Sequence, residues 1–138
     1  MRPRTLLLLA SLLLLLVTGC GNAYSPATTT GDSSARQLSP AAFSRELASG
    51  SRTVINVHTP DEGSIPGTDL AVPFDLVIDS VDELPANRDQ PLAVYCKSGR
   101  MSKDAVMTLA DLDYTDIVEL KGGMDAWSAS GRKLAESD

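Results

Sequence analysis

The sequence of 138 residues has no hydrophobic run long enough to span a membrane. Its longest apolar run, residues 6–17, has 12 residues and includes Ser11, whereas a membrane-spanning helix takes roughly 20. Arg2 and Arg4 precede this run. A small basic region before a short apolar core is typical of a signal peptide, so residues 1–19 are predicted to lie outside the fold.

The end of this segment predicts where the mature chain begins. Val17-Thr18-Gly19-Cys20 resembles a bacterial lipobox, in which a lipid is attached to the cysteine and cleavage leaves it at the N-terminus. The resemblance implies export and a lipid anchor on Cys20, at the cell surface or the periplasmic face of a bacterial membrane. An ordinary signal peptide with an incidental Cys20 is the alternative.

Cysteine and histidine are scarce. The chain has two cysteines, Cys20 and Cys96, and one histidine, His58. With Cys20 acylated, Cys96 would be the only free thiol, which excludes an internal disulfide and the resolving partner that thioredoxin-type redox chemistry needs. One histidine and one available cysteine cannot supply four zinc ligands. We therefore expect no metal and no cofactor, and a function for the thiol of Cys96.

Positive charge is limited as well. The chain has 12 Lys and Arg against 18 Asp and Glu, and the predicted mature chain has 10 against 18, a net charge of −8. Without a basic patch, this balance excludes a nucleic-acid partner. Lys97 and Arg100 form a locally basic loop in an otherwise acidic chain, which favours a small anion as the ligand.

The rest of the chain divides into a tether and one domain. Residues 20–37 contain little to bury and predict a flexible tether, and residues 38–135 predict a domain that is monomeric by default. Ser39-Pro40 is typical of a helix start. Strands are predicted over residues 53–58, 69–73, 92–95 and 116–120, and further helices over residues 74–84, 103–112 and 124–129. This alternation predicts an α/β fold with a mainly parallel sheet covered by helices on both faces.

Cys96 lies between a predicted strand and a predicted helix, in Pro91-Leu-Ala-Val-Tyr-Cys-Lys-Ser-Gly-Arg-Met-Ser102. Sheets of this kind bind ligands at the carboxyl ends of their strands. Loop N–H groups and the positive end of the following helix favour negative charge there, and the same field stabilises a thiolate over a thiol. Cys96 is therefore predicted to be a nucleophile, and a buried, inert cysteine is the alternative.

Four short motifs resemble the single-domain rhodaneses, which are sulfurtransferases that carry sulfur as a cysteine persulfide. They are the loop 96–102, the strand and turn 54–62, the Gly-Ser-Ile-Pro-Gly-Thr turn 63–68, and the strand, Gly-Gly turn and Ala-Trp helix 119–127. They stand in the family's order within about residues 38–135. The resemblance implies a rhodanese-like three-layer domain with a mainly parallel central sheet.

The resemblance also implies a reaction. The Cys96 thiolate attacks the outer sulfur of a sulfane donor such as thiosulfate and expels sulfite. The persulfide then passes its sulfur to a thiol or to cyanide. The implied partners are thus a small sulfur-containing anion and an acceptor of this kind.

The residues implied to bind the substrate anion are those of the loop, namely Lys97, Ser98, Gly99, Arg100, Met101 and Ser102. Arg100 is the better candidate for contact with oxyanions, because its planar fork donates two parallel hydrogen bonds. Ser98, Gly99 and Met101 are expected to contribute backbone N–H groups. Ser102 is expected to cap the following helix. A Ser102 hydroxyl that also faces the ligand is the alternative.

Other polar and aromatic residues have structural interpretations. Tyr95 and Trp127 are predicted to lie in the core, and Gly122-Gly123 to form a tight turn. Asp61-Glu62 is interpreted as a solvated turn. His58 is not expected to touch the substrate.

The sequence departs from the family pattern mainly near its first strand. Asn56 stands where the family usually has Asp, His58 where Arg is common, and Ser64 where a His is found. Met101 occupies a position that is often Arg or Thr, and about four residues are missing between Glu62 and Gly63. These changes leave the thiol and its loop intact, so they bear on rate and donor choice.

Three other functions compete with sulfur transfer. A phosphatase needs Arg six positions after the cysteine, where this chain has Ser102. A weakly active or inactive module that binds an anion or a protein partner at the cell surface is the main alternative. A thiol sensor of oxidants would form a stable sulfenate at Cys96.

Overall fold

Five parallel strands form one sheet in the order β1-β5-β4-β2-β3 in the computed structural model, which describes residues 35–135. The strands are β1 (Ala35–Leu38), β2 (Thr53–Asn56), β3 (Leu70–Ala71), β4 (Leu92–Tyr95) and β5 (Ile117–Leu120), and the helices are α1 (Pro40–Ala48), α2 (Arg100–Asp111) and α3 (Gly123–Ala129). Their arrangement confirms the predicted α/β class. No helix within the described range is long and apolar enough to cross a membrane.

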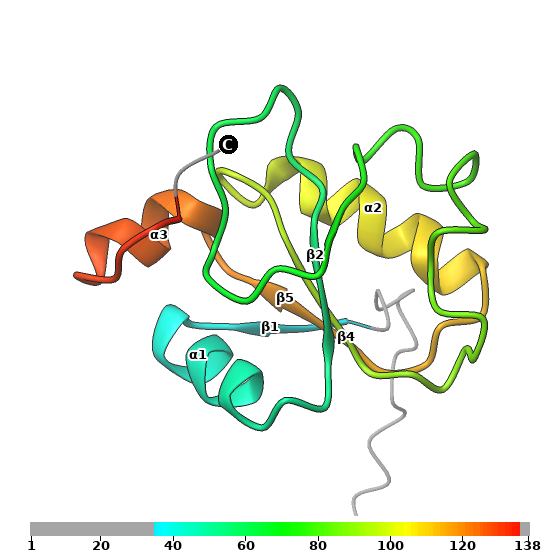
Figure 1. The fold of residues 1–138 in the computed structure, drawn as a ribbon, viewed down its shortest axis with the longest axis horizontal. Coiled ribbons are helices and arrows are strands. Elements are labelled where there is room, and N and C mark those ends of the chain that lie inside the picture. The colour runs from blue at the N-terminus through cyan, green and yellow to red at the C-terminus, as the bar shows by residue number, and fades with distance from the viewer. Residues whose placement is uncertain (1–34, 136–138) are drawn as a thin grey trace, which may run out of the picture.

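The sheet is covered on both faces, with α1 and α2 on opposite sides (Figure 1). Every residue of β4 is buried, and successive side chains point to opposite faces of a strand. Leu92 and Val94 accordingly join the cluster beneath α2, whereas Ala93 and Tyr95 join the cluster that includes Trp127 of α3. Near-continuous apolar strands are what burial on both faces requires.

The start of α1 is the predicted one. The Ser39 side chain accepts a hydrogen bond from the backbone N–H of Ala42 at 3.3 Å, and Pro40 opens the helix. Proline suits this position because the first N–H groups of a helix have no partner within it. The helix then buries Phe43, whose ring meets Trp127 edge-on with centroids 6.5 Å apart.

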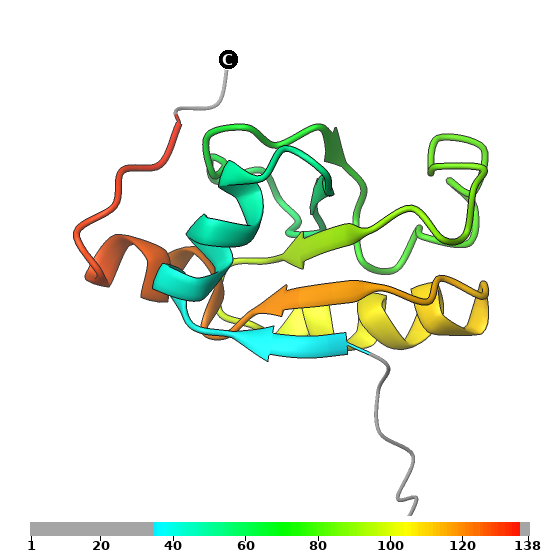
Figure 2. The same ribbon diagram turned by 90° about the horizontal axis from the view of Figure 1, so that it is seen from below.

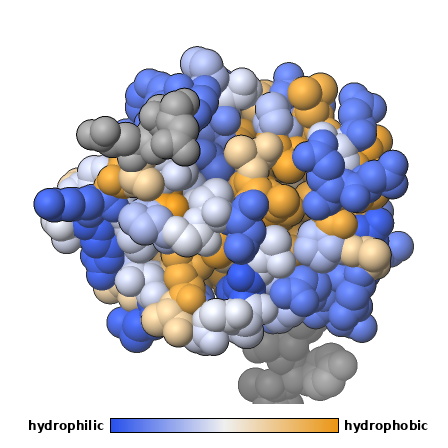
Figure 3. Space-filling view, in the orientation of Figure 1, coloured by the Kyte–Doolittle hydropathy of each residue, from blue (hydrophilic) through white to orange (hydrophobic). Residues whose placement is uncertain are grey.

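The helix predicted over residues 74–84 is wrong, because these residues form consecutive turns. Three of the hydrogen bonds in the segment span three residues, including Val81 N–H to Ile78 and Leu84 N–H to Val81, whereas an α-helix needs consecutive four-residue bonds. Its apolar pattern still buries Val77 and Leu84. Ile78 stays 65% exposed. Figure 3 shows apolar side chains at the surface on the face of the molecule that Figure 1 presents.

Two predicted boundaries also need correction. Residues 35–37, assigned to the tether, belong to β1, which pairs with β5 over its whole length. A short polar strand at a sheet edge carries no apolar pattern, so its pairing could not be predicted locally. The predicted signal peptide, Cys20 and residues 20–34 of the tether lie outside the described residues.

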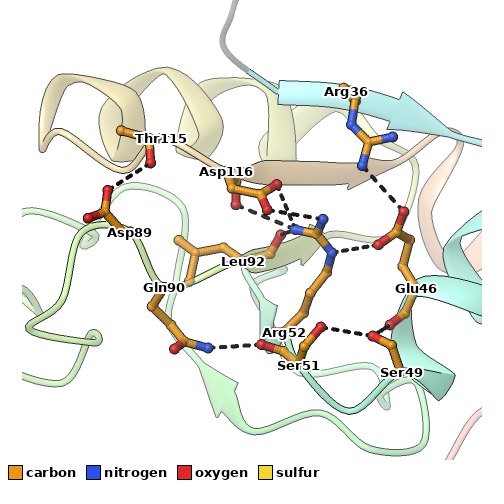
Figure 4. Close-up of polar contacts among 10 residues, drawn as sticks. All are labelled: Arg36, Glu46, Ser49, Ser51, Arg52, Asp89, Gln90, Leu92, Thr115 and Asp116. Carbon is orange, nitrogen blue, oxygen red and sulfur yellow. Dashed lines mark hydrogen bonds and ion pairs between the residues drawn. The ribbon is translucent and has the colours of Figure 1, made fainter.

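Arg52 joins several elements at the amino ends of the strands (Figure 4). Its guanidinium donates to Glu46 at 2.8 Å, to Asp116 at 2.9 Å and to the carbonyl of Leu92 at 3.1 Å, and its side chain is only 6% exposed. The bond from Arg52 holds the pKa of Glu46 below its usual value, with a smaller effect from Arg36. This network fixes the end of the sheet opposite Cys96.

Arg52→Met is expected to lower the free energy of unfolding by about 2 kcal/mol, because the Leu92 carbonyl and the Asp116 carboxylate lose this donor and Glu46 keeps only Arg36. A lowered pKa means that the Glu46 contribution is present above its unfolded-state pKa and disappears as the pH falls through the folded value. The difference in the free energy of unfolding between the wild type and Arg52→Met should therefore shrink below about pH 4. Chemical denaturation at neutral and acidic pH measures both effects.

Arg36→Met is the matched control, because Arg36 bonds the same carboxylate at 3.3 Å but its side chain is 60% exposed. The decrease in the free energy of unfolding of Arg36→Met should stay below about 0.5 kcal/mol. Equal losses for the two variants would contradict the role given to burial of Arg52.

Candidate functional site

Cys96 lies where β4 ends and the chain turns into α2. The strands are parallel, and Figure 2 shows the arrowheads of β1, β4 and β5 at the end of the sheet that α3 also occupies. Gly99 makes the turn possible, because its φ of 88° is a left-handed conformation that side chains disfavour. Its N–H donates to the Cys96 Sγ at 3.1 Å. The predicted combination of strand, loop and thiol is therefore present.

The thiol is almost completely buried, with Cys96 1% exposed, and polar groups lie beside it. Its Sγ donates to the Ser102 Oγ at 3.5 Å. Ser102 is itself buried and donates to a Glu119 carboxylate oxygen at 2.6 Å. The other carboxylate oxygen accepts from the Gln37 side-chain amide at 2.9 Å. Cys96 is thus buried as the alternative interpretation expected, and it belongs to the apolar cluster beneath α2, but its sulfur also contacts the Ser102 hydroxyl and the Gly99 N–H.

Ser102 differs from its prediction. The helix α2 begins at Arg100 with Gly99 as its N-cap, so Ser102 is the third residue of the helix and not its cap. The hydroxyl turns to Cys96 and Glu119, because the side chain at this position points away from solvent. The Ser102 hydroxyl therefore bonds to the thiol and to Glu119 and does not cap the helix.

The predicted Gly-Gly turn packs directly against the cysteine loop. The N–H of Met124 donates to the Cys96 carbonyl at 2.9 Å, and the N–H of Asp125 to the Lys97 carbonyl at 2.9 Å. A Cβ on Gly123 would lie 2.3 Å from the Cys96 carbonyl oxygen. The first turn of α3 can therefore support the loop only with glycine at this position.

Lys97 is paired with a carboxylate that the sequence interpretation left in a solvated turn. Its ammonium lies 2.5 Å from a Glu62 oxygen, and both side chains are partly exposed. The bond from Lys97, and then that from His58, lowers the pKa of Glu62, and Glu62 in turn raises the pKa of Lys97. Glu62 thus ties the segment after β2 to the loop that carries the thiol.

The other loop residues have different surroundings. Ser98 and Arg100 are exposed, and Arg100 forms no ion pair with any of the described residues. Met101 is half-buried and packs against the core cluster beneath α2. Of the two loop cations, Arg100 is therefore the one free to meet an anion.

The departures near β2 form a local network. Asn56 is 5% exposed, and its amide donates to the Gly63 carbonyl at 3.2 Å and accepts from the His58 N–H at 3.0 Å. The His58 Nε2 lies 2.5 Å from Glu62. An amide satisfies both a donor and an acceptor, which a carboxylate could not do, so Asn56 organises this segment without an ion.

Tyr95 and Trp127 lie in the core as predicted. Burial raises the pKa of Tyr95, whose hydroxyl accepts from the Ile65 N–H at 2.9 Å and lies 2.6 Å from the Thr68 hydroxyl. This contact holds the Gly63–Thr68 turn against β4, next to the cysteine loop.

Glu119 and Gln37 are the residues near the thiol that sequence reasoning missed. Glu119 is the one charged residue of β5, all of whose residues are buried. A charge inside a buried strand is rare unless it is paired, and that was the available signal. Within the described range, no group of three or more His, Cys, Asp or Glu side chains could hold a metal ion.

Comparisons with known proteins agree with this fold. A model of the rhodanese-like domain matches residues 39–130. A sulfurtransferase of Allochromatium vinosum is 33% identical over 81 residues, covering 56% of this chain and 73% of that protein. The structure of a rhodanese-related protein from Thermoplasma volcanium has a TM-score of 0.62 at 28% identity, covering 72% of this chain and 97% of that one. A possible tyrosine phosphatase from Rhodopseudomonas palustris has a TM-score of 0.62 at 21% identity, covering 74% and 86%, a likeness of fold alone.

Proposed function

Because the chain belongs to the family of rhodanese-like domains, we propose that it moves sulfane sulfur through a persulfide on Cys96. The donor is an anion such as thiosulfate, and the acceptor is a thiol or cyanide. The observation that carries the proposal is the Cys96 Sγ at the carboxyl end of β4, 3.1 Å from the N–H of Gly99. The relative named a sulfurtransferase supports sulfur transfer as the class of reaction.

The proposed first step is a nucleophilic substitution at sulfur. The Cys96 thiolate attacks the outer sulfur of thiosulfate, a new S–S bond forms, and the old S–S bond breaks with its electron pair leaving on sulfite. The Gly99 N–H and the first turn of α2 stabilise negative charge on the cysteine sulfur. Arg100 binds the sulfonate oxygens, since Lys97 is held by Glu62.

In the second step, the acceptor attacks the outer sulfur of the persulfide. The bond between the two sulfurs breaks, and its electron pair returns to Cys96. Because Cys96 is 1% exposed, the loop must admit the acceptor to the outer sulfur. A small acceptor such as cyanide is therefore expected to react faster than a bulky thiol.

The export of the chain is part of the proposal. Residues 1–19 act as a lipoprotein signal peptide, a lipid on Cys20 anchors the chain to a bacterial membrane, and the following residues up to β1 form the tether. On such a tether, the domain works as a monomer.

The second candidate is a module that binds an anion or a partner without turnover. The burial of Cys96 and the pairing of Lys97 with Glu62 favour it, because both reduce access of an anionic donor to the sulfur. In that case, the bound anion would remain intact.

The test is to incubate the reduced, full chain with thiosulfate and to measure its intact mass. We expect a gain of one sulfur atom that is lost on adding cyanide, with thiocyanate formed in equal amount. Prior treatment with iodoacetamide should prevent the gain. A folded and reduced chain that gains no sulfur from thiosulfate or other sulfane donors would overturn the proposal in favour of the binding module.

A further inference from the structure

Glu119 is a buried carboxylate in β5. It is 3% exposed, and among residues 35–135 it forms no ion pair. Its two described partners are neutral, Ser102 at 2.6 Å and Gln37 at 2.9 Å. A buried charge without a countercharge is unfavourable for stability, so stability alone does not account for it.

The proton positions along this chain of groups follow from its geometry. A separation of 2.6 Å is typical of a hydroxyl that donates to an ionised carboxylate. Ser102 has one proton, and it is directed to Glu119, so the Ser102 oxygen can only accept from Cys96. In the reduced site, the Cys96 thiol therefore donates to the Ser102 hydroxyl, which donates to the Glu119 carboxylate. This agrees with the 3.5 Å contact from Sγ to Oγ.

From this arrangement we propose that Glu119 takes the proton of the Cys96 thiol through the Ser102 hydroxyl. The thiol proton moves to the Ser102 oxygen as the hydroxyl proton moves to Glu119. The product is a thiolate that accepts from Ser102, which in turn accepts from a neutral Glu119 carboxyl. The two hydrogen bonds of the relay are kept with their direction reversed, the bonds from Gly99 and Gln37 are unchanged, and the buried site keeps a single negative charge.

The proposal rests on the proposed function and completes its proton balance. Thiol, carboxylate and thiosulfate become persulfide anion, carboxylic acid and sulfite, so three negative charges stand on each side. When the acceptor removes the outer sulfur, the electron pair returns to the Cys96 sulfur. The proton then returns from Glu119 through Ser102, and the resting thiol is restored. Glu119 acts through Ser102 and is thus a positioning residue that stores a proton.

Other charges near this relay are exposed to solvent. They are Arg100 on the loop, Asp125 on α3, Lys121 after β5 and Arg36 on β1, whereas Lys97 is partly exposed and is paired with Glu62. Solvent and salt screen exposed charges much more than buried ones. Glu119 is thus the buried charge that contacts this relay directly.

The test is the rate at which iodoacetamide alkylates Cys96 in the full chain, followed by the mass of the peptide that contains it. In the wild type the proposed internal transfer to Glu119 supplies the reactive thiolate without loss of a proton to solvent, so the rate should change less than about twofold from pH 6 to pH 8. In Glu119→Gln the thiol must lose its proton to solvent, and the rate should rise about tenfold per pH unit. Ser102→Ala cuts the relay and should behave like Glu119→Gln.

Glu119→Gln keeps the shape of the side chain and removes a buried charge, so the variant is expected to fold. Thr108→Ala, which removes a hydroxyl elsewhere on α2, should keep the wild-type profile. A flat profile in Glu119→Gln, or a tenfold slope in the wild type, would overturn the relay. Alkylation needs no sulfur donor, so failure of thiosulfate to load the wild type would overturn the proposed function without affecting this test.

Discussion

Replacing Cys96 by serine is expected to abolish sulfur loading while the domain stays folded. Serine is close in size to cysteine, and its oxygen can accept the Gly99 N–H and donate to Ser102 as the thiol does. A hydroxyl gives almost no anion at neutral pH, so it cannot replace the thiolate as nucleophile. The loading rate should fall by at least about 10³-fold, to the background level, as measured by intact mass after thiosulfate.

The matched control is Cys20→Ser, with both variants prepared as the full, unlipidated chain, so that each has one thiol and this one keeps Cys96. This variant should load one sulfur at the wild-type rate. If Cys96→Ser still gained cyanide-labile sulfur, the reactive thiol would be Cys20, and the persulfide assigned to Cys96 would be wrong. If Cys96→Ser lost turnover but kept affinity for an anion, the loop 96–102 would bind the anion independently of the thiol chemistry.

The second large effect is expected for Gly123→Ala. The new Cβ would lie 2.3 Å from the Cys96 carbonyl oxygen and 2.5 Å from the Lys97 carbonyl carbon, both backbone atoms. The loop would have to move away from α3 and lose its bonds from Met124 and Asp125. We expect a loss of more than about 3 kcal/mol in the free energy of unfolding, measured by chemical denaturation. Any folded fraction should load sulfur more slowly, because the displaced loop carries the thiol.

Gly131→Ala separates the effect of the clash from that of backbone conformation. Gly131 also has a positive φ, 84°, but a Cβ there would meet nothing within 4 Å. The decrease in the free energy of unfolding of Gly131→Ala should be about 1 kcal/mol, which is the usual cost of placing a residue with a side chain in the left-handed conformation. Similar losses for both variants would show that the contact between α3 and the loop is not what requires glycine at position 123.

The location of the thiol could be predicted because it depends on local pattern. The buried run Leu92–Tyr95 indicates a central strand, and Gly99 indicates the turn into a helix, so Cys96 had to lie at a strand end. The same kind of pattern failed over residues 74–84. The apolar spacing there selects the side chains that become buried, but turns can bury Val77 and Leu84 as well as a helix can.

The sequence by itself therefore determined the α/β class, the covered parallel sheet, the core positions of Tyr95 and Trp127, and the strand-end position of Cys96. All of these follow from hydrophobic period and turn residues, which act over a few neighbours. The tertiary structure alone decided which polar side chains meet at the site. Lys97 meets Glu62 across 35 residues, and Gln37 meets Glu119 across 82. Such pairs depend on strand order and register, which place distant residues side by side only once the whole sheet has formed.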